Sequence, residues 1–221
     1  MNDLQEQELL QLLPYHDPLL RVPAQTVIFP LSKDDSDLIS NMLYSVEDSQ
    51  LAAAKAPWPS AAGMAAPQWG ASRRIFVIQR QNLELFNSVT KTKQKKLPGS
   101  DGFIVVINPK YEGLVEDEID WDGTGEADEA NANTSDDSCE DSKTSIKQVQ
   151  DWEGCFSVPG KRGIVRRYSS IKAQFSSIDG IHHTIVLRGW AARVFQHETD
   201  HIEGRLYDDT KAHKCIKVVE V

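Results

Sequence analysis

Hydrophobic residues follow two different periods along this chain. Between Asp34 and Ala54 they recur every three or four positions, which predicts an amphipathic helix that ends before the proline-rich segment 56–59. Shorter apolar runs between turn residues predict strands at 75–79, 103–107, 144–149, 164–166, 171–178, 182–187 and 215–221. The dipeptide Asp179-Gly180 predicts a hairpin turn between two of these strands.

Two segments near the start of the chain have weaker patterns, and a third segment predicts a second helix. Residues 3–12 predict a short amphipathic helix, and residues 19–29 predict extended chain. The second long helix is expected from residue 189 onward, with Gly204 as its stop signal. Its apolar stripe consists of Trp190, Val194 and Phe195 and is interrupted by Arg193.

Length and composition indicate a single domain over residues 1–221. Of the 221 residues 40% are hydrophobic, and no apolar run approaches the ~18 residues of a membrane-spanning helix. The polar, acidic first residues lack the features of a secretory or organellar leader. The 3 cysteines, an odd and scattered set, favour a reducing compartment, with Cys139 and Cys215 as free thiols.

The acidity of the chain comes from one segment. The net charge is −9, and residues 116–141 hold twelve Asp and Glu residues without any Lys or Arg, so the rest of the chain carries −9 + 12, about +3. Because this segment is poor in apolar residues, we expect 116–142 to be a mobile insertion rather than an ordered calcium loop. Its flanks, 109–114 and 144–149, are expected to pair as a hairpin with the insertion at the tip. The basic run 91–96 is expected to be a solvated loop, and no sequence-specific nucleic-acid site is predicted.

The second predicted helix carries the strongest chemical signal. His197 and His201 are four positions apart, so on a helix both imidazoles lie on one face, and Glu198 follows the first of them. In this pattern the two histidines hold one metal ion and the glutamate acts as a general base. The alternative is a helix with two unrelated histidines, but the intervening glutamate favours the metal site.

A catalytic metal site of this kind needs a third protein ligand. One class of metallopeptidase has a third histidine where this chain has Tyr207. Of the downstream acids, Glu203 is too close to the helix and Glu220 lies at the chain end. An upstream ligand is left, and Cys155 is the best candidate because the adjacent Gly154 lets the backbone approach the metal.

Three motifs, in order, resemble those of the peptide deformylase family. They are Gly63-Met64-Ala65-Ala66-Pro67-Gln68, Glu153-Gly154-Cys155-Phe156-Ser157 and Gln196-His197-Glu198-Thr199-Asp200-His201. The chain departs from the family at Ala61, where the first motif usually has glycine, and in the length of the acidic insertion. With the element pattern, the resemblance implies an α+β fold in which small antiparallel or mixed β-sheets pack around a central metal-binding helix that carries His-Glu-x-x-His.

The resemblance implies a hydrolase that removes the N-formyl group from the N-terminal formyl-methionine of newly made polypeptides and releases formate. The implied metal ligands are Cys155, His197 and His201. Glu198 would be the general base, and the side chain of Gln68 and the backbone N–H of Phe156 would stabilise the oxyanion. The implied substrate-binding residues are Gly63, Met64, Arg162 and Trp190. Arg162 either orients the peptide or pairs with a loop acid.

The resemblance also implies a cofactor and partners. One divalent metal ion is expected, with Fe²⁺ as the native ion; a Cys/His₂ set equally suits Zn²⁺, Ni²⁺ or Co²⁺, and Zn²⁺ or Ni²⁺ is expected in purified protein. The expected partners are N-formyl-methionyl nascent peptides and, transiently, the ribosome, but no membrane. The expected compartment is the cytoplasm of a bacterial-type cell or, alternatively, an organelle. A generic zinc peptidase and a non-catalytic binding relative are the alternative functions.

Overall fold

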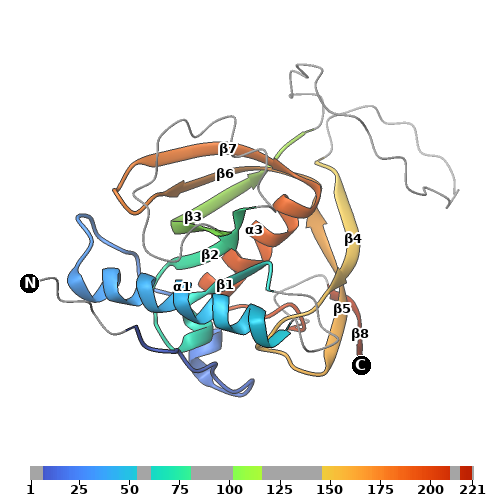
Figure 1. Cartoon of the computed structure of the whole chain (residues 1–221). Helices are drawn as coiled ribbons and strands as arrows, with labels where there is room; N and C mark the ends of the chain where they lie inside the picture. The colour runs from blue at the N-terminus through green and yellow to red at the C-terminus, as the bar shows by residue number, and fades with distance from the viewer. Residues whose placement is uncertain (1–6, 54–60, 81–101, 116–145, 210–214, 221) are drawn as a thin grey trace, which may run out of the picture.

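Helix α3 (Gly189–Ile202) lies between two antiparallel β-sheets (Figure 1). This computed structural model describes residues 7–53, 61–80, 102–115, 146–209 and 215–220. The strands are β1 (Gly63–Ala65), β2 (Ile75–Gln79), β3 (Phe103–Gly113), β4 (Gln148–Glu153), β5 (Lys161–Tyr168), β6 (Ser170–Ser176), β7 (His182–Arg188) and β8 (Cys215–Glu220). One sheet has the order β1-β2-β3-β6-β7 and the other β4-β5-β8. The predicted α+β class is therefore confirmed.

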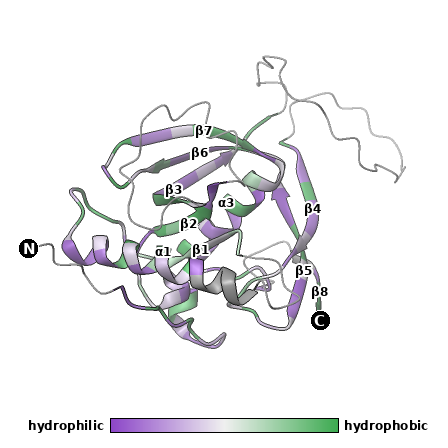
Figure 2. Ribbon diagram, viewed as in Figure 1, coloured by the Kyte–Doolittle hydropathy of each residue, from purple (hydrophilic) through white to green (hydrophobic). Residues whose placement is uncertain are grey.

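Strand β2 is buried on both faces, which explains why its sequence is a continuous apolar run. On one face Phe76 packs edge-to-face against Phe195 of α3, with ring centroids 5.2 Å apart. On the other face Val77 belongs to a hydrophobic cluster that includes the buried side of helix α1 (Lys33–Ala53). Met42 of this helix is fully buried in the cluster. Figure 2 shows the hydrophobic colouring concentrated on these central strands. The first long helix and this strand lie where the periodicity predicts them.

The C-terminal end of α3 depends on one glycine. Gly204 has φ +69, and a β-carbon on it would lie 2.7 Å from the carbonyl carbons of Arg21 and Val22. Arg21 is the last residue of a short 3₁₀ helix, η1 (Pro18–Arg21), and Val22 follows it. The extended chain predicted at 19–29 is therefore wrong for its first residues, because the Asp17 side chain caps this helix. Only glycine fits this left-handed, crowded position, so the predicted stop signal is confirmed.

Strand β3 is longer than its apolar run because it continues through a bulge. The ladder to β6 shifts register between Ile107 and Lys110, and Asn108 has φ 53. The Asn108 side chain accepts a hydrogen bond from the Val27 N–H (3.0 Å) and donates one to the Val27 carbonyl (2.9 Å). This pairing ties the extended N-terminal segment to the sheet.

The helix predicted at residues 3–12 is wrong for its described part. Residues 7–12 have no helical turn, because their backbone groups bond to side chains of α1 instead of to each other. The N–H of Glu8 donates to Asn41 Oδ1 (3.1 Å), and the N–H of Leu10 donates to Ser45 Oγ (2.8 Å). The amphipathic pattern of this segment therefore reflects packing along α1.

The expected hairpin between 109–114 and 144–149 is also wrong. Strand β3 pairs with β2 and β6, whereas β4 begins only at Gln148 and pairs with β5 in the other sheet. The two segments still meet, because a β-carbon on Gly113 would lie 2.7 Å from Ile146 Cγ2. The acidic segment 116–142, the basic run 91–96 and Cys139 lie outside the described residues. No described helix is long and apolar enough to cross a membrane.

Candidate active site

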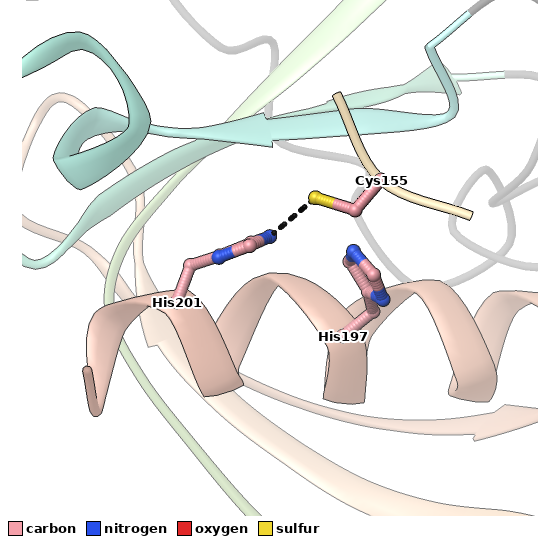
Figure 3. A group of neighbouring side chains, drawn as sticks. All are labelled: Cys155, His197 and His201. Carbon is pink, nitrogen blue, oxygen red and sulfur yellow. Dashed lines mark hydrogen bonds between the residues drawn. The ribbon is translucent and has the colours of Figure 1, made fainter. Parts of the chain in front are cut away.

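The three expected metal ligands lie together (Figure 3). His197 and His201 project from one face of α3, and Cys155 reaches them from the loop that follows β4. Cys155 Sγ is 3.3 Å from His201 Nε2, and one ligand atom from each residue lies within 4.8 Å of the others. A thiolate and two imidazoles at this separation form a donor set suited to a transition-metal ion.

His197 is held in one orientation by Glu153. The two residues are 44 positions apart in sequence, and His197 Nδ1 lies 2.8 Å from Glu153 Oε2. A proton on Nδ1 that points to the carboxylate leaves the Nε2 lone pair free to face Cys155 and a metal ion. The face of the ring is stacked on Tyr207, at 6.3 Å between centroids. Tyr207 thus packs against the expected ligand His197, at the sequence position where one class of metallopeptidase has its third histidine ligand.

Glu153 is itself the centre of a buried charge network. Arg167 binds it in a bidentate pair, with both N–O distances 2.9 Å, and Arg193 Nη1 donates to it at 2.7 Å. Arg167 also pairs with Asp200 of α3. Burial acts to raise the pKa of Glu153, but hydrogen bonds from Arg167 and His197 outweigh it and keep this pKa well below its ordinary value. The carboxylate that orients His197 is therefore ionised at neutral pH.

Glu198 lies beside the ligands in a dry environment. Its side chain is 3% exposed, and Oε2 has no hydrogen-bond partner among the described residues. Burial raises the pKa of Glu198 to about 7, although the nearby His197 lowers it. A carboxyl group with a pKa near neutrality can both accept and donate a proton at physiological pH.

Gln68 is held in place by the motif that contains it. It lies in the 3₁₀ helix η2 (Ala66–Trp69), and its Oε1 accepts the backbone N–H of Ala65 at 2.8 Å. The Nε2 group then faces the site, 3.0 Å from Ser157 Oγ and 3.5 Å from Cys155 Sγ. The amide is 1% exposed, so its N–H groups form a pre-oriented donor next to the ligands.

A cavity of about 370 Å³ opens onto this site. It is lined by Gly63, Met64, Phe156, Arg162 and Trp190, together with Gln68, Cys155, His197 and Glu198. The residues proposed from the sequence to bind substrate therefore all border one space, which has the size of a ligand pocket. His201, the third expected ligand, is buried and is not among the lining residues.

Two residues of the cavity lining, Trp190 and Ala61, depart from what the sequence led us to expect. Trp190 is 53% exposed and borders the cavity, so it does not belong to the buried stripe of α3. The reason is that α3 begins at the cavity rim, and its buried side starts only at Ala191. Ala61, where glycine was expected, is 5% exposed and packs in the cluster around α1, so its methyl group fills core space.

Sequence reasoning missed the residues that support the ligands. No local sequence pattern indicates that Glu153 contacts Arg167 and Arg193. Two signals were present: Glu153 stands two positions before the candidate cysteine, and Arg193 interrupts an otherwise apolar helix stripe. A buried arginine requires a buried acid, which makes such an interruption informative.

Comparison with known proteins finds one family. The family model "Polypeptide deformylase" matches residues 9–215. "Peptide deformylase 1A, chloroplastic" from Solanum lycopersicum is 27% identical over 221 residues, which cover 100% of this chain and 66% of that protein. The chain thus spans about two thirds of the length of this curated relative.

Solved structures have the same fold. An Arabidopsis thaliana peptide deformylase 1B in complex with an inhibitor is 26% identical, with a TM-score of 0.58, over 90% of this chain and 80% of that chain. A Met-Ala-Ser-bound class I type b peptide deformylase from Acinetobacter baumannii has a TM-score of 0.58 at 22% identity, over 91% of this chain and 98% of that chain. The second likeness supports the fold alone.

Proposed function

The chain belongs to the polypeptide deformylase family, whose members remove the N-formyl group from the N-terminal methionine of nascent polypeptides, and from this premise we propose how it acts. Cys155, His197 and His201 hold one divalent metal ion next to the base Glu198. The observation that carries this proposal is the approach of Cys155 to the two histidines, with all ligand atoms within 4.8 Å. Cys155 lies 42 positions before His197, the first residue of the helix motif. A generic zinc peptidase does not need a cysteine at this place.

The donor set fits a divalent transition metal. A thiolate and two imidazoles bind Fe²⁺, Zn²⁺, Ni²⁺ and Co²⁺, and we propose Fe²⁺ as the native ion, with Zn²⁺ or Ni²⁺ after purification in air. The ion supplies a water of lowered pKa and an electrophilic contact for the formyl oxygen. Metal analysis of protein purified anaerobically from cells grown with iron would identify it.

Glu198 is proposed to transfer the protons of the reaction. Its buried carboxylate accepts a proton from the attacking water and delivers it to the leaving amine of methionine. Support comes from its pKa of about 7 and from its position on α3, directly after the ligand His197. The absence of a described hydrogen-bond partner at Oε2 leaves this oxygen available for the water.

Gln68 and Phe156 are proposed to stabilise the oxyanion. As water adds to the formyl carbon, the formyl oxygen gains negative charge, and the Gln68 side-chain amide and the Phe156 backbone N–H donate hydrogen bonds to it. The contact of Gln68 Oε1 with the Ala65 N–H fixes the amide, so its N–H groups need no reorientation during the reaction. Removal of one such donor typically lowers kcat by about 10²–10³-fold.

The peptide is proposed to bind along strand β1. This strand is at the edge of its sheet and pairs only with β2 among the described strands, so the backbone of Gly63 has a free side that borders the cavity. An extended peptide that adds to such an edge forms main-chain hydrogen bonds that tolerate any sequence. Met64, Arg162 and Trp190 border the same cavity and contact the substrate side chains in this proposal.

Cellular context is proposed from the reaction and from the relatives. Formylated nascent peptides emerge at ribosomes, so the protein contacts them transiently, and co-sedimentation at low and moderate salt would test this contact. We assign the protein to the cytoplasm of a bacterial-type cell, with an organelle as the alternative because the tomato relative is chloroplastic. Fractionation of cells with the tagged native protein would distinguish the two.

One assay tests the proposed activity. Protein purified anaerobically with iron should release formate from formyl-Met-Ala-Ser. Cleavage of internal peptide bonds instead would indicate a peptidase, and tight binding of the peptide without turnover would indicate a non-catalytic relative. A Cys155→Ala variant should lose metal and activity together, which ties the turnover to this site.

A further inference from the structure

Tyr207 contacts both of the elements that hold the proposed ligands. It follows the end of α3, after the left-handed turn at Gly204, and its ring is stacked on that of His197, ten positions earlier. The same ring belongs to a hydrophobic cluster with Val158, against which Cys155 packs. Because Tyr207 is only 1% exposed, its hydroxyl needs a hydrogen-bond partner inside the protein.

The Tyr207 hydroxyl bonds to the strand that follows the loop of Cys155. It donates to the backbone carbonyl of Lys161 at 2.9 Å, across 46 positions of sequence. Lys161 is the first residue of β5, and the loop 154–160 that carries Cys155 ends directly before it. This hydrogen bond therefore joins the far end of the loop to the residue that packs against His197.

The near end of the loop is joined to α3 as well. Glu153, the last residue of β4, lies 2.8 Å from His197 Nδ1 and accepts a hydrogen bond from Arg193 at 2.7 Å. Figure 3 shows that Cys155 reaches the histidines from the loop between these two attachments. Because ordering a residue costs conformational entropy, a loop fixed at both ends holds its cysteine in place at a smaller cost on binding than a loop fixed at one end.

We infer that Tyr207 is a positioning residue, which sets the distance between Cys155 and the two histidines through its hydrogen bond to Lys161. This inference rests on the proposed function, since it takes these three side chains as the metal ligands. Atoms bound to one tetrahedral ion at about 2.0–2.3 Å are about 3.5 Å apart. The 3.3 Å between Cys155 Sγ and His201 Nε2 is close to this spacing, which a shift of the loop by about 1 Å would lose.

The ring and the hydroxyl of Tyr207 can be tested separately. A phenylalanine keeps the ring against His197 and Val158, and it removes only the hydrogen bond to the Lys161 carbonyl. Tyr207→Phe therefore changes the attachment of the loop while the volume of the core stays nearly the same.

Ser45→Ala is the matched control for the loss of a buried hydroxyl. Ser45 is buried in α1, which carries no proposed site residue, and its hydroxyl accepts the backbone N–H of Leu10 at 2.8 Å. Both variants lose one buried hydrogen bond between a hydroxyl and the backbone, so both should unfold at a lower urea concentration than the wild type. Only Tyr207→Phe should alter the metal site.

The test uses Co²⁺ as the probe, because a bound thiolate gives Co²⁺ a sulfur-to-metal absorption band that reports on Cys155 alone. Titration against a coloured chelator should show about 10-fold weaker Co²⁺ binding by Tyr207→Phe, and the band should weaken or shift per bound ion. At saturating Co²⁺, kcat for formyl-Met-Ala-Ser should fall by about 10-fold with KM unchanged, since Tyr207 does not line the cavity. Ser45→Ala should match the wild type in all of these quantities.

The outcomes separate this inference from the proposed function. Wild-type Co²⁺ affinity and absorption band in Tyr207→Phe would overturn the inference. An equal loss of affinity in Ser45→Ala would overturn it as well, because the loss would then follow from stability and not from the attachment of the loop. A wild-type protein that shows the sulfur-to-cobalt band but releases no formate would overturn the proposed function alone, and the comparison of Co²⁺ binding would still decide the role of Tyr207.

Discussion

Gly63 and Glu198 lie so close together that a β-carbon on the glycine would be 2.9 Å from both Cγ and Oε1 of the glutamate. Carbon atoms in van der Waals contact do not approach to this distance, so a larger residue at position 63 must displace the carboxylate or strand β1. The proposed general base Glu198 can therefore lie this close to β1, the strand proposed to bind the peptide, only because position 63 has no side chain.

Gly63→Ala should lower kcat/KM for formyl-Met-Ala-Ser by about 10–100-fold, because a displacement of Glu198 by about 1 Å misplaces the proton acceptor. Metal content should stay the same, since no ligand is touched. Gly102→Ala is the control, because its β-carbon would meet no other atom within 4 Å. Equal losses in the two variants would mean that the Gly63–Glu198 contact has no special role.

Glu198→Gln keeps the shape of the side chain and removes the proton acceptor. We expect kcat to fall by about 10²–10⁴-fold with the metal still bound. Stopped assays of formate release, paired with metal analysis of the same sample, check both quantities. Activity at a tenth of the wild-type value would show that another group takes the proton.

The same substitution should stabilise the metal-free protein at high pH. Burial raises the pKa of Glu198 from 4.5 to about 7, so between these pH values the folded state binds a proton that the unfolded state has lost. Below pH 4.5 both states are protonated and there is no cost, whereas above pH 7 the buried charge lowers the free energy of unfolding by about 3 kcal/mol.

Urea unfolding with a chelator measures this effect. Glu198→Gln should raise the free energy of unfolding by about 3 kcal/mol at pH 8 and by less than about 0.5 kcal/mol near pH 4.5. Glu112→Gln, at a side chain that is 64% exposed, is the control and should change stability little at either pH. A gain that does not depend on pH would contradict the assignment of the cost to ionisation of Glu198.

Glu153→Gln should lower both the stability of the fold and the metal affinity of the site. The substitution leaves Arg167 and Arg193 buried without their shared carboxylate, and removing one partner from a buried charge network typically costs about 3–5 kcal/mol. It also weakens the hydrogen bond that orients His197, so metal affinity should fall by about 10–100-fold. Unfolding curves and competition with a metal indicator measure the two effects. Wild-type metal affinity in a destabilised variant would restrict Glu153 to a structural role.

Replacement of residues 117–141 by a short Gly/Asn turn should leave the fold and the site intact. The flanks belong to different sheets, but the contact between Gly113 and Ile146 brings them together, so a short link can join them. Shortening a loop changes its closure entropy by only about 0.6 kcal/mol per halving. The melting temperature, metal content and turnover of formyl-Met-Ala-Ser should remain near their wild-type values. A large loss of turnover would make the insertion part of the working site.

Local chemistry in the chain was enough to identify the centre of this protein. The spacing of His197 and His201 implies a shared helix face because a helix repeats every ~3.6 residues. The apolar run of β2 and the turn glycine at 204 are equally local, since burial on both faces and a left-handed φ each require a particular residue type. Features of this kind can be predicted from the sequence without knowledge of distant contacts.

Contacts between distant segments were decided by the tertiary structure. Glu153 meets Arg193 and His197 across 40 and 44 positions, and neither periodicity nor spacing encodes such a pair. The flanks of the acidic insertion enter different sheets because β4 pairs with β5, although their adjacency in sequence favours a hairpin. The same holds for Trp190, whose apolar character predicts burial but whose position at the first turn of α3 exposes it at the cavity rim. In each case the deciding energy is burial or pairing against a segment that is remote in sequence, and only the folded chain brings that segment near.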